Sequence, residues 1–276
     1  MKNLTERQTR EKEYYEQFAE KFNINRPIDF SPVDGPLLEK ERRPWNSYWR
    51  TYEIPVDFLR KQKETQKEYH LLDFGCGPGD NSLRFARAGY KVAGFDICEK
   101  NINSCKILFE KNNNSEQGNF LVGVAEKIPF ADESFEVVVG IDILHHVDIP
   151  KAISEVQRVL KKDGIAIFRE PVEVPFFDII RNTKLVRFLF PNKSSLEAHI
   201  TEDERKLNKF DLNTIKEIFP NMTIERSLVL SRFDKILRKH DNPKSSGLEK
   251  WDYFCSKILP SYGLFGGASV IILKKN

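Results

Sequence analysis

The chain has 276 residues with 44 Lys and Arg against 41 Asp and Glu, and its formal charge of +3 is too balanced to indicate a nucleic acid or an anionic surface as partner. Apolar residues make up 40% of the sequence and 21 residues are Phe, which excludes a disordered or fibrous chain. No run of about 18 apolar residues is present, so we expect no membrane-spanning helix. The N-terminus is charged throughout, so we expect no secretory signal. The four cysteines form no CxxC pair, which predicts a reduced, cytoplasmic protein.

In chain order, aromatic residues first mark an amphipathic helix around residues 14–22, and residues 45–61 predict a second helix. Short apolar runs then alternate with segments of helical periodicity. The predicted strands are 70–74, 91–95, 120–124, 135–141 and 165–168, and the helices between them are 81–88, 99–111 and 149–160. Later the pattern predicts a helix over 211–219 with Asp211 as N-cap, then strands over 223–230 and 268–273. Such alternation forms right-handed βαβ units, so the sequence predicts an α/β fold with a mostly parallel sheet.

A glycine cluster follows the first predicted strand, in the run LLDFGCGPGD at residues 71–80. Glycines at a strand-to-helix turn let the backbone pass close to a ligand, and Asp96 at the end of the second strand is placed to accept both hydroxyls of a ribose. On spacing alone a dinucleotide and a nucleoside cofactor both fit, and a purely structural turn is the alternative. Asp73 and Asp80 flank the glycines and would repel phosphates. S-adenosylmethionine has an ammonium, a sulfonium and a ribose but no phosphate, so it suits these charges best.

Four segments in the order LLDFGCGPGD, VAGFDI, AEKIPFADESFEVVV and EVQRVLKKDGIAIFREP resemble the motifs of class I S-adenosylmethionine-dependent methyltransferases, in the branch that acts on small molecules. They span about residues 69–171. The resemblance implies a Rossmann-like α/β fold with seven strands, the last antiparallel, helices on both faces of the sheet and an aromatic-rich cap. We expect an N-terminal helical cap over 1–68 and a methyltransferase domain over 69–276, with cap insertions at about 172–210 and 232–265.

The resemblance also implies which residues hold S-adenosylmethionine and its product, S-adenosylhomocysteine. Asp73 and the backbone of the glycine loop hold the methionine end, Asp96 holds the ribose, and Ile97 packs on the adenine. The loop residues are Gly75, Cys76, Gly77 and Gly79, while Ala125 and Glu126 border the base and Gly140 and Ile141 line the methionine side. Val124 stands where the family usually has an acid for the adenine amino group. Either Glu126 replaces that acid, or packing and backbone contacts alone hold the base.

Two adjacent histidines, His145 and His146, follow the fourth predicted strand at the edge of the sheet where ligands of such folds bind. For methyl transfer the protein mainly aligns the nucleophile, the methyl group and the sulfur. A hydroxyl acceptor must also lose its proton, and histidine, with an ordinary pKa of about 6.5, is suited to take that proton. We expect a general base or an acceptor contact from this pair; capping of the strand end is the alternative. Asp142 would orient a histidine, contact the acceptor, or only face water. Adjacent histidines rarely converge on one ion, so we expect no metal site.

The segment 174–190 is rich in phenylalanine and in basic residues. Because it follows the fifth strand directly, we expect a lid whose apolar face, with Phe176 and Phe177, covers the acceptor. A basic amphipathic helix on a membrane surface and plain packing are the alternatives. Tyr14 and Tyr15 would close the same pocket from the other side, or only pack.

Taken together, the motifs predict an enzyme that moves a methyl group from S-adenosylmethionine to an O, N or C atom of a small molecule. No Asn-Pro-Pro-Tyr-like run follows the fourth strand, which argues against methylation of DNA bases, and we expect no nucleic acid partner. Two alternatives stay open. One is a lipid- or quinone-directed methyltransferase at the membrane surface, and the other is a non-catalytic protein that binds S-adenosylmethionine.

Overall fold

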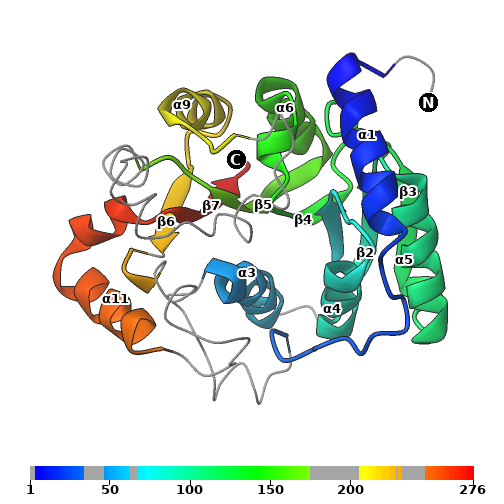
Figure 1. The fold of residues 1–276 in the computed structure, drawn as a ribbon, viewed down its shortest axis with the longest axis horizontal. Coiled ribbons are helices and arrows are strands. Elements are labelled where there is room, and N and C mark those ends of the chain that lie inside the picture. The colour runs from blue at the N-terminus through cyan, green and yellow to red at the C-terminus, as the bar shows by residue number, and fades with distance from the viewer. Residues whose placement is uncertain (1–3, 34–46, 63–66, 175–204, 228, 232–245) are drawn as a thin grey trace, which may run out of the picture.

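The computed structural model describes residues 4–33, 47–62, 67–174, 205–227, 229–231 and 246–276 (Figure 1). Phe176, Phe177 and the predicted lid beyond Val174 lie outside the described residues, as do parts of both expected cap insertions.

Within the described residues, seven strands form one sheet in the order β3-β2-β1-β4-β5-β7-β6, and β7 is antiparallel to both of its neighbours. The strands are β1 (His70–Phe74), β2 (Lys91–Asp96), β3 (Gly118–Val122), β4 (Phe135–Ile141), β5 (Leu160–Pro171), β6 (Thr223–Ser227) and β7 (Ala268–Lys274). This arrangement confirms the predicted Rossmann-like fold with a mostly parallel sheet. The strand order reverses between β1 and β4, and at such a point the loops at the carboxyl ends of the strands leave a crevice for ligands.

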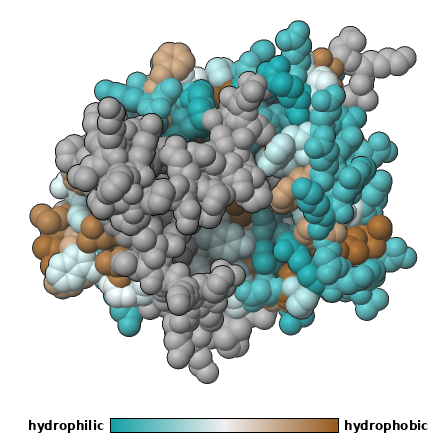
Figure 2. Space-filling view, in the orientation of Figure 1, coloured by the Kyte–Doolittle hydropathy of each residue, from teal (hydrophilic) through white to brown (hydrophobic). Residues whose placement is uncertain are grey.

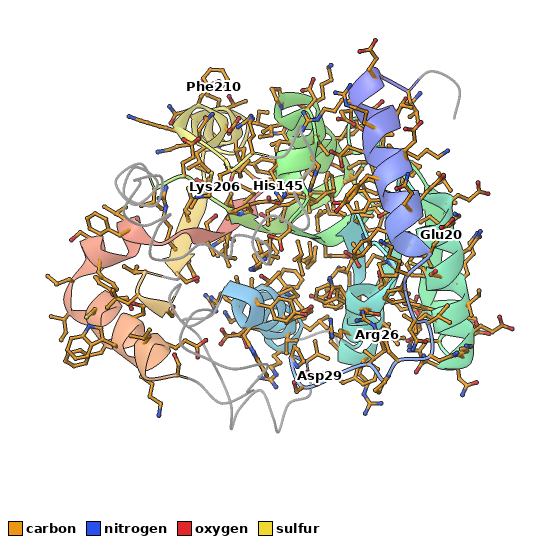
Figure 3. All side chains as sticks on the ribbon, viewed as in Figure 1. Glu20, Arg26, Asp29, His145, Lys206 and Phe210 are labelled. Atoms are coloured by element: carbon orange, nitrogen blue, oxygen red, sulfur yellow. The ribbon has the colours of Figure 1, made fainter. Side chains whose placement is uncertain are left out.

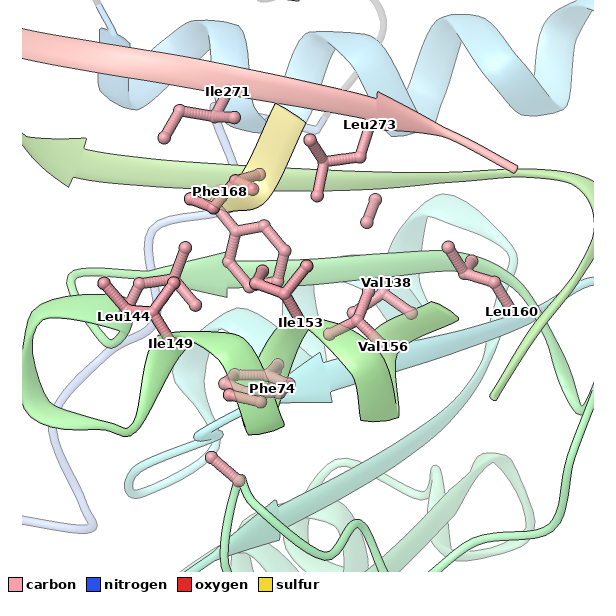
Figure 4. Packing of buried hydrophobic residues seen from close by; sticks show 14 of the residues in the cluster. Phe74, Val138, Leu144, Ile149, Ile153, Val156, Leu160, Phe168, Ile271 and Leu273 are labelled. Atoms are coloured by element: carbon pink, nitrogen blue, oxygen red, sulfur yellow. The ribbon is translucent and has the colours of Figure 1, made fainter. Parts of the chain in front are cut away.

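Helices cover both faces of the sheet, as predicted (Figure 1). Successive strand residues point to opposite faces, so Leu72 packs under α6 and α9 while Leu71 packs under α3, α4 and α5. Figure 4 shows the first of these layers, in which Ile153 and Val156 of α6 face Phe168 of β5. The helices are α1 (Glu6–Ala19), α3 (Ser47–Lys61), α4 (Asp80–Ala88), α5 (Glu99–Lys111), α6 (Ile149–Val159), α9 (Lys209–Ile218) and α11 (Gly247–Ile258).

Most element boundaries follow the prediction, and the differences have local causes. Asn208, not Asp211, is the N-cap of α9, because its side chain accepts from the backbone of Phe210 and Asp211. Asp211 is the reciprocal partner of this capping box, since its carboxylate accepts from the Asn208 N–H at 2.9 Å. The third strand begins two residues earlier than predicted, because Gly118 already pairs with Val92 of β2.

The chain that leaves β5 is fixed on both sides of residues 175–204. Val172 and Leu207 form a parallel bridge, in which the Leu207 N–H donates to the Pro171 carbonyl at 3.0 Å and the Glu173 N–H donates to the Leu207 carbonyl at 2.9 Å. The residues that flank 175–204, at Val172 and Leu207, therefore lie side by side at the carboxyl end of β5.

We expect Ile153→Ala to lower the free energy of unfolding by about 2–5 kcal/mol, because Ile153 is fully buried between α6 and the sheet and its truncation leaves a cavity. Urea unfolding followed by circular dichroism measures the change. Phe210→Ala on α9 is the control, because that ring is 75% exposed and its loss should change the free energy of unfolding little. Equal effects of the two substitutions would contradict the assignment of the core.

Candidate functional site

The glycine loop after β1 has positive φ angles at three of its glycines. Gly75, Gly77 and Gly79 have φ values of +73°, +51° and +98°. A Cβ at Gly75 would come within 2.8 Å of the Ile143 side chain, so this glycine lets the loop after β4 pack against the glycine loop. A Cβ at Gly77 would meet nothing within 4 Å, so packing within the protein leaves space beside this residue. The loop thus offers open room at the crevice of the sheet, as a ligand cradle requires.

Asp96 ends β2 beside this loop and holds its backbone. One carboxylate oxygen accepts from the Gly77 N–H at 3.0 Å, and the other accepts from the Cys98 N–H at 2.8 Å and from the Asn101 side chain at 3.2 Å. Burial raises the pKa of Asp96, while these hydrogen bonds act in the opposite direction. The residue is only partly buried, and its bond to the Gly77 N–H places its carboxylate beside the glycine loop.

Asp73 is a second acid of the site and is almost completely buried at the end of β1. Its carboxyl accepts from the Ser82 hydroxyl at 2.5 Å, across the glycine loop. Burial raises the pKa of Asp73 to about 7, with a smaller contribution of the same sign from Asp96. An acid with this pKa favours a cationic neighbour, because a positive charge would offset the cost of ionising it. Asp80, the third acid considered in the sequence, forms an ion pair with Arg26 instead.

A buried carboxylate organises the loop after β4. Glu170 of β5 is fully buried, and its Oε1 accepts from the backbone N–H groups of Ile143 at 2.9 Å and Leu144 at 2.8 Å. Its Oε2 lies 2.6 Å from Nδ1 of His145, which is itself 4% exposed. Asp142, at the start of this loop, has a positive φ of 54°, is exposed and forms an ion pair with Arg169.

Helix α1 covers the histidines from the other side. Arg7 donates to the carbonyl of His145 at 3.1 Å, and the Tyr15 hydroxyl lies 3.3 Å from Nε2 of His146. Glu11 is 5% exposed, and its Oε2 lies 3.2 Å from Nδ1 of His146. The far end of α1 is held by Glu20, which pairs with Lys100 of α5 at 2.6 Å (Figure 3). The helix therefore runs from the loop after β4 to α5, across the carboxyl edge of the sheet.

Glu126, which with Ala125 is predicted to border the adenine, contacts α1 and the start of α6. Glu126 accepts from the Gln8 side chain of α1 and from the Asp148 N–H, both at 2.9 Å, so its two oxygens tie α1 and the start of α6 together. Ala125 is buried beside it, and Val124 bridges to Lys127. Ile97 is partly buried directly after Asp96.

The structure thus gathers most of the predicted site at one edge of the sheet. The predicted residues found there are Asp73, Gly75, Cys76, Gly77, Gly79, Asp96, Ile97, Ala125, Glu126, Gly140, Ile141, Asp142, His145 and His146, with Tyr15 against His146 and Tyr14 in edge contact with Tyr15. Their individual roles stay predictions. Sequence reasoning missed Glu170 and Glu11. The available signal for Glu170 was an acid two residues after the apolar run of residues 165–168.

Comparison with known proteins identifies the family. The protein-family model described as "Methyltransferase domain" matches residues 72–168 of this chain. The demethylmenaquinone methyltransferase of Chlorobaculum tepidum is 30% identical over 213 residues, which are 76% of this chain and 76% of that protein. The chain belongs to the class I S-adenosylmethionine-dependent methyltransferases. It is accordingly an enzyme, and its cofactor is S-adenosylmethionine.

Other relatives and solved structures agree with this assignment. The ubiquinone biosynthesis O-methyltransferase of Pelagibacter ubique is 35% identical over 114 residues, 41% of this chain and 46% of that protein. The geranyl diphosphate C-methyltransferase of Streptomyces coelicolor has the same fold, with a TM-score of 0.60, 15% identity and coverage of 99% of this chain and 100% of that one. The [4+2]-cyclase SpnF also shares the fold, with a TM-score of 0.52 and 18% identity over 83% of each chain. The fold alone therefore does not fix the reaction.

The residues of the crevice fit S-adenosylmethionine. A Cβ at Gly77 would meet no atom within 4 Å, the Asp96 carboxylate lies beside the loop, and the buried Asp73 favours the positive charges that this cofactor carries. Among the described residues, no group of three His, Cys, Asp or Glu side chains is arranged to hold a metal ion.

We expect Asp96→Ala to weaken S-adenosylmethionine binding by about 1–3 kcal/mol, roughly 5- to 150-fold, through loss of charge-assisted bonds to the ribose. Isothermal titration calorimetry measures the affinity. Asn101→Ala is the matched control, because it removes one donor to Asp96 but keeps the carboxylate. Unchanged affinity in Asp96→Ala would rule out the ribose contact.

A second prediction concerns pH. Because a cation binds best to ionised Asp73, the association constant of S-adenosylmethionine should rise up to about tenfold per pH unit below pH 7 and level off above it. The same raised pKa makes the cofactor-free fold lose stability as pH rises from about 4 towards 7, since the unfolded chain has already released the proton that the folded chain keeps. Calorimetric titrations with the cofactor between pH 5.5 and 7.5 test the first trend, and urea unfolding of the cofactor-free protein between pH 4 and 7.5 tests the second, each with the wild type and Asp73→Asn. An equal slope in Asp73→Asn would assign the proton to another group.

Proposed function

We propose that this methyltransferase acts on a lipophilic small molecule with an ionisable ring hydroxyl, as in a hydroquinone, and that His145 is its general base. The observation that carries the proposal is the buried pair of Glu170 and His145 at the carboxyl edge of the sheet. The names of the relatives support the acceptor class, because two of them act in menaquinone or ubiquinone chemistry.

The cofactor site follows from the residues at the crevice. S-adenosylmethionine, when bound, supplies an electrophilic methyl group on a sulfonium. In our proposal Asp96 holds the ribose, while Asp73 and the backbone around Gly77 hold the methionine end. The two oxygens of Glu126 are directed to the Gln8 side chain of α1 and to the Asp148 N–H at the start of α6. We therefore favour packing against Ile97 and backbone contacts near Ala125 for the adenine.

In our proposal the hydrogen bonds of Glu170 select the tautomer of His145. Two backbone N–H groups donate to one of its oxygens, so the carboxylate acts as an acceptor and the His145 Nδ1 donates to the other. A neutral imidazole that carries its proton on Nδ1 presents a lone pair at Nε2. Glu170 thereby orients the ring and stabilises the charge that His145 acquires when it takes a proton.

This base suits a phenolic acceptor. A ring hydroxyl has an ordinary pKa of about 10, within reach of a histidine that takes the proton as the methyl group is transferred. A phenolate is nucleophilic at its oxygen and at the adjacent ring carbons, so one base serves O- or C-methylation. His146 has a different role in this proposal, since its two nitrogens face Tyr15 and Glu11 of α1.

The cap residues complete the proposal. Tyr15, and Tyr14 beside it, lie on the helix that covers the histidines and would border the acceptor. Phe176, Phe177 and the expected lid stay predictions, as does a cytoplasmic location. No helix among the described residues is both long enough and apolar enough to span a membrane.

We expect His145→Ala to keep S-adenosylmethionine affinity within about twofold while its turnover falls by roughly 10²- to 10⁴-fold. Glu170→Gln should also lower turnover and shift its pH profile, because the ring loses its charged partner. His146→Ala is the matched control, and its turnover should fall much less.

The assay uses methyl-labelled S-adenosylmethionine with prenylated hydroquinones, and with the lipid and aqueous fractions of a metabolite extract. Labelled product in the lipid fraction is expected. Equal turnover in His145→Ala and His146→Ala would leave capping of the strand end as the better account of the pair. Label found only in the aqueous fraction would overturn the acceptor class.

A further inference from the structure

Five large apolar side chains lie exposed together on α11 and on the short helical segment η5 (Pro260–Phe265) that follows and packs against it. They are Trp251, Phe254, Ile258, Leu259 and Leu264, each between 55% and 64% exposed, and we call them the α11 patch. Figure 2 shows apolar surface gathered at the left edge, where Figure 1 places α11. The other exposed large apolar residues of the described chain are Phe265, beside the patch, and four that lie singly on α1, α5, β3 and α9. A gathered patch of this kind marks an interaction surface.

The outward orientation of the patch is fixed by a buried acid. Asp252 is 6% exposed and accepts hydrogen bonds from the three consecutive backbone N–H groups of residues 229–231 and from the hydroxyls of Ser231 and Tyr262. One carboxylate thereby ties α11 to the chain after β6 and to η5. Spacings of three and four residues place Trp251, Phe254 and Ile258 on one face of the helix. These side chains are thus presented to solvent by an anchored element.

The exposed charge within residues 246–267 is positive. This stretch contains two acids, and both are buried: Asp252 in the bonds above, and Glu249 in the capping box with Ser246. Lys250 is exposed on α11. Although the net charge of the whole chain is only +3, the described residues of 246–267 thus combine exposed aromatic and aliphatic side chains with an exposed lysine and no exposed carboxylate. Such a composition complements a lipid surface with anionic headgroups.

The patch lies on the edge of the sheet that also carries the cofactor site. Ser227 at the end of β6 pairs with Ala268 at the start of β7, and Ala268 pairs with Pro171 at the end of β5. The segment η5 ends directly before β7, so it belongs to the same carboxyl edge as Glu170 and His145. Because α11 packs against η5, the α11 patch adjoins the edge of the sheet that carries Glu170 and His145.

We propose that the α11 patch docks this enzyme on a membrane surface that contains anionic phospholipid. The choice of a lipid partner rests on the proposed lipophilic acceptor, but the docking itself depends only on the patch. Trp251 and Phe254, whose ring centroids lie 6.1 Å apart, enter the interface between headgroups and acyl chains, and Lys250 faces the headgroup phosphates. A second copy of the chain on the same patch is the competing occupant, and the experiment distinguishes the two.

Co-sedimentation with vesicles tests the docking without cofactor or acceptor. The probes are vesicles of phosphatidylcholine alone and vesicles with about 30% phosphatidylglycerol, where each basic residue near the surface contributes most. We expect the wild type to bind the anionic vesicles, and the triple variant W251Q/F254Q/L264Q to bind them at least tenfold more weakly. K250E should weaken binding and reduce its dependence on salt. F210Q, on the exposed ring of α9, is the matched control and should bind as the wild type does.

Two further measurements separate this proposal from the proposed function. The triple variant should methylate a short-chain, water-soluble hydroquinone as fast as the wild type, because the patch does not touch the reacting groups. If the wild type binds vesicles but methylates no hydroquinone, the docking stands and the acceptor class fails. Absence of binding to anionic vesicles would overturn the docking. So would a concentration-dependent dimer in analytical ultracentrifugation that the triple substitution abolishes, since the patch would then join two copies of the chain.

Discussion

Glu170 is fully buried, and its carboxylate accepts from two backbone N–H groups and one imidazole of the loop after β4. A charge in such a position is tolerated only when nearby donors replace the lost water, so the strand and the loop constrain each other. The loop in turn places Ile143 against Gly75, which sets how closely the glycine loop approaches β4. The positions of the His145 loop and of the glycine loop therefore both depend on the buried Glu170 carboxylate.

Helix α1 meets this arrangement from outside and makes polar contacts with both halves of the site. It reaches the histidine loop through Arg7 and Tyr15 and the predicted adenine border through Gln8. Glu11 brings a second buried carboxylate to the adjacent histidine. Each histidine of the pair thus has its own acid, one from a strand of the sheet and one from the N-terminal helix.

The sequence predicted the central sheet well, because apolar runs and helical periodicity report burial directly, as in the exactly predicted strand His70–Phe74. The glycines and acids at strand ends were expected at one edge of the sheet, because parallel strands end at the same edge, and their roles toward the cofactor stay predictions. Glu170 and Asp252 were not singled out, because their partners are backbone N–H groups far away in the sequence. The helix α11 was assigned only to a cap insertion, since a pattern of apolar residues does not distinguish an exposed face from a buried one.

The main-chain hydrogen bonds of the bridge between Val172 and Leu207 join the two ends of the segment that follows β5. These bonds do not depend on which side chains the two residues carry. The closing point is thus independent of what lies between the two residues, and the entropic cost of a longer segment grows only slowly with its length. The hydrogen bonds that close this junction therefore do not depend on the sequence between Val172 and Leu207. If the predicted lid lies in that segment, as the sequence predicts, acceptor specificity can change by exchange of the segment while the junction at the end of β5 is kept.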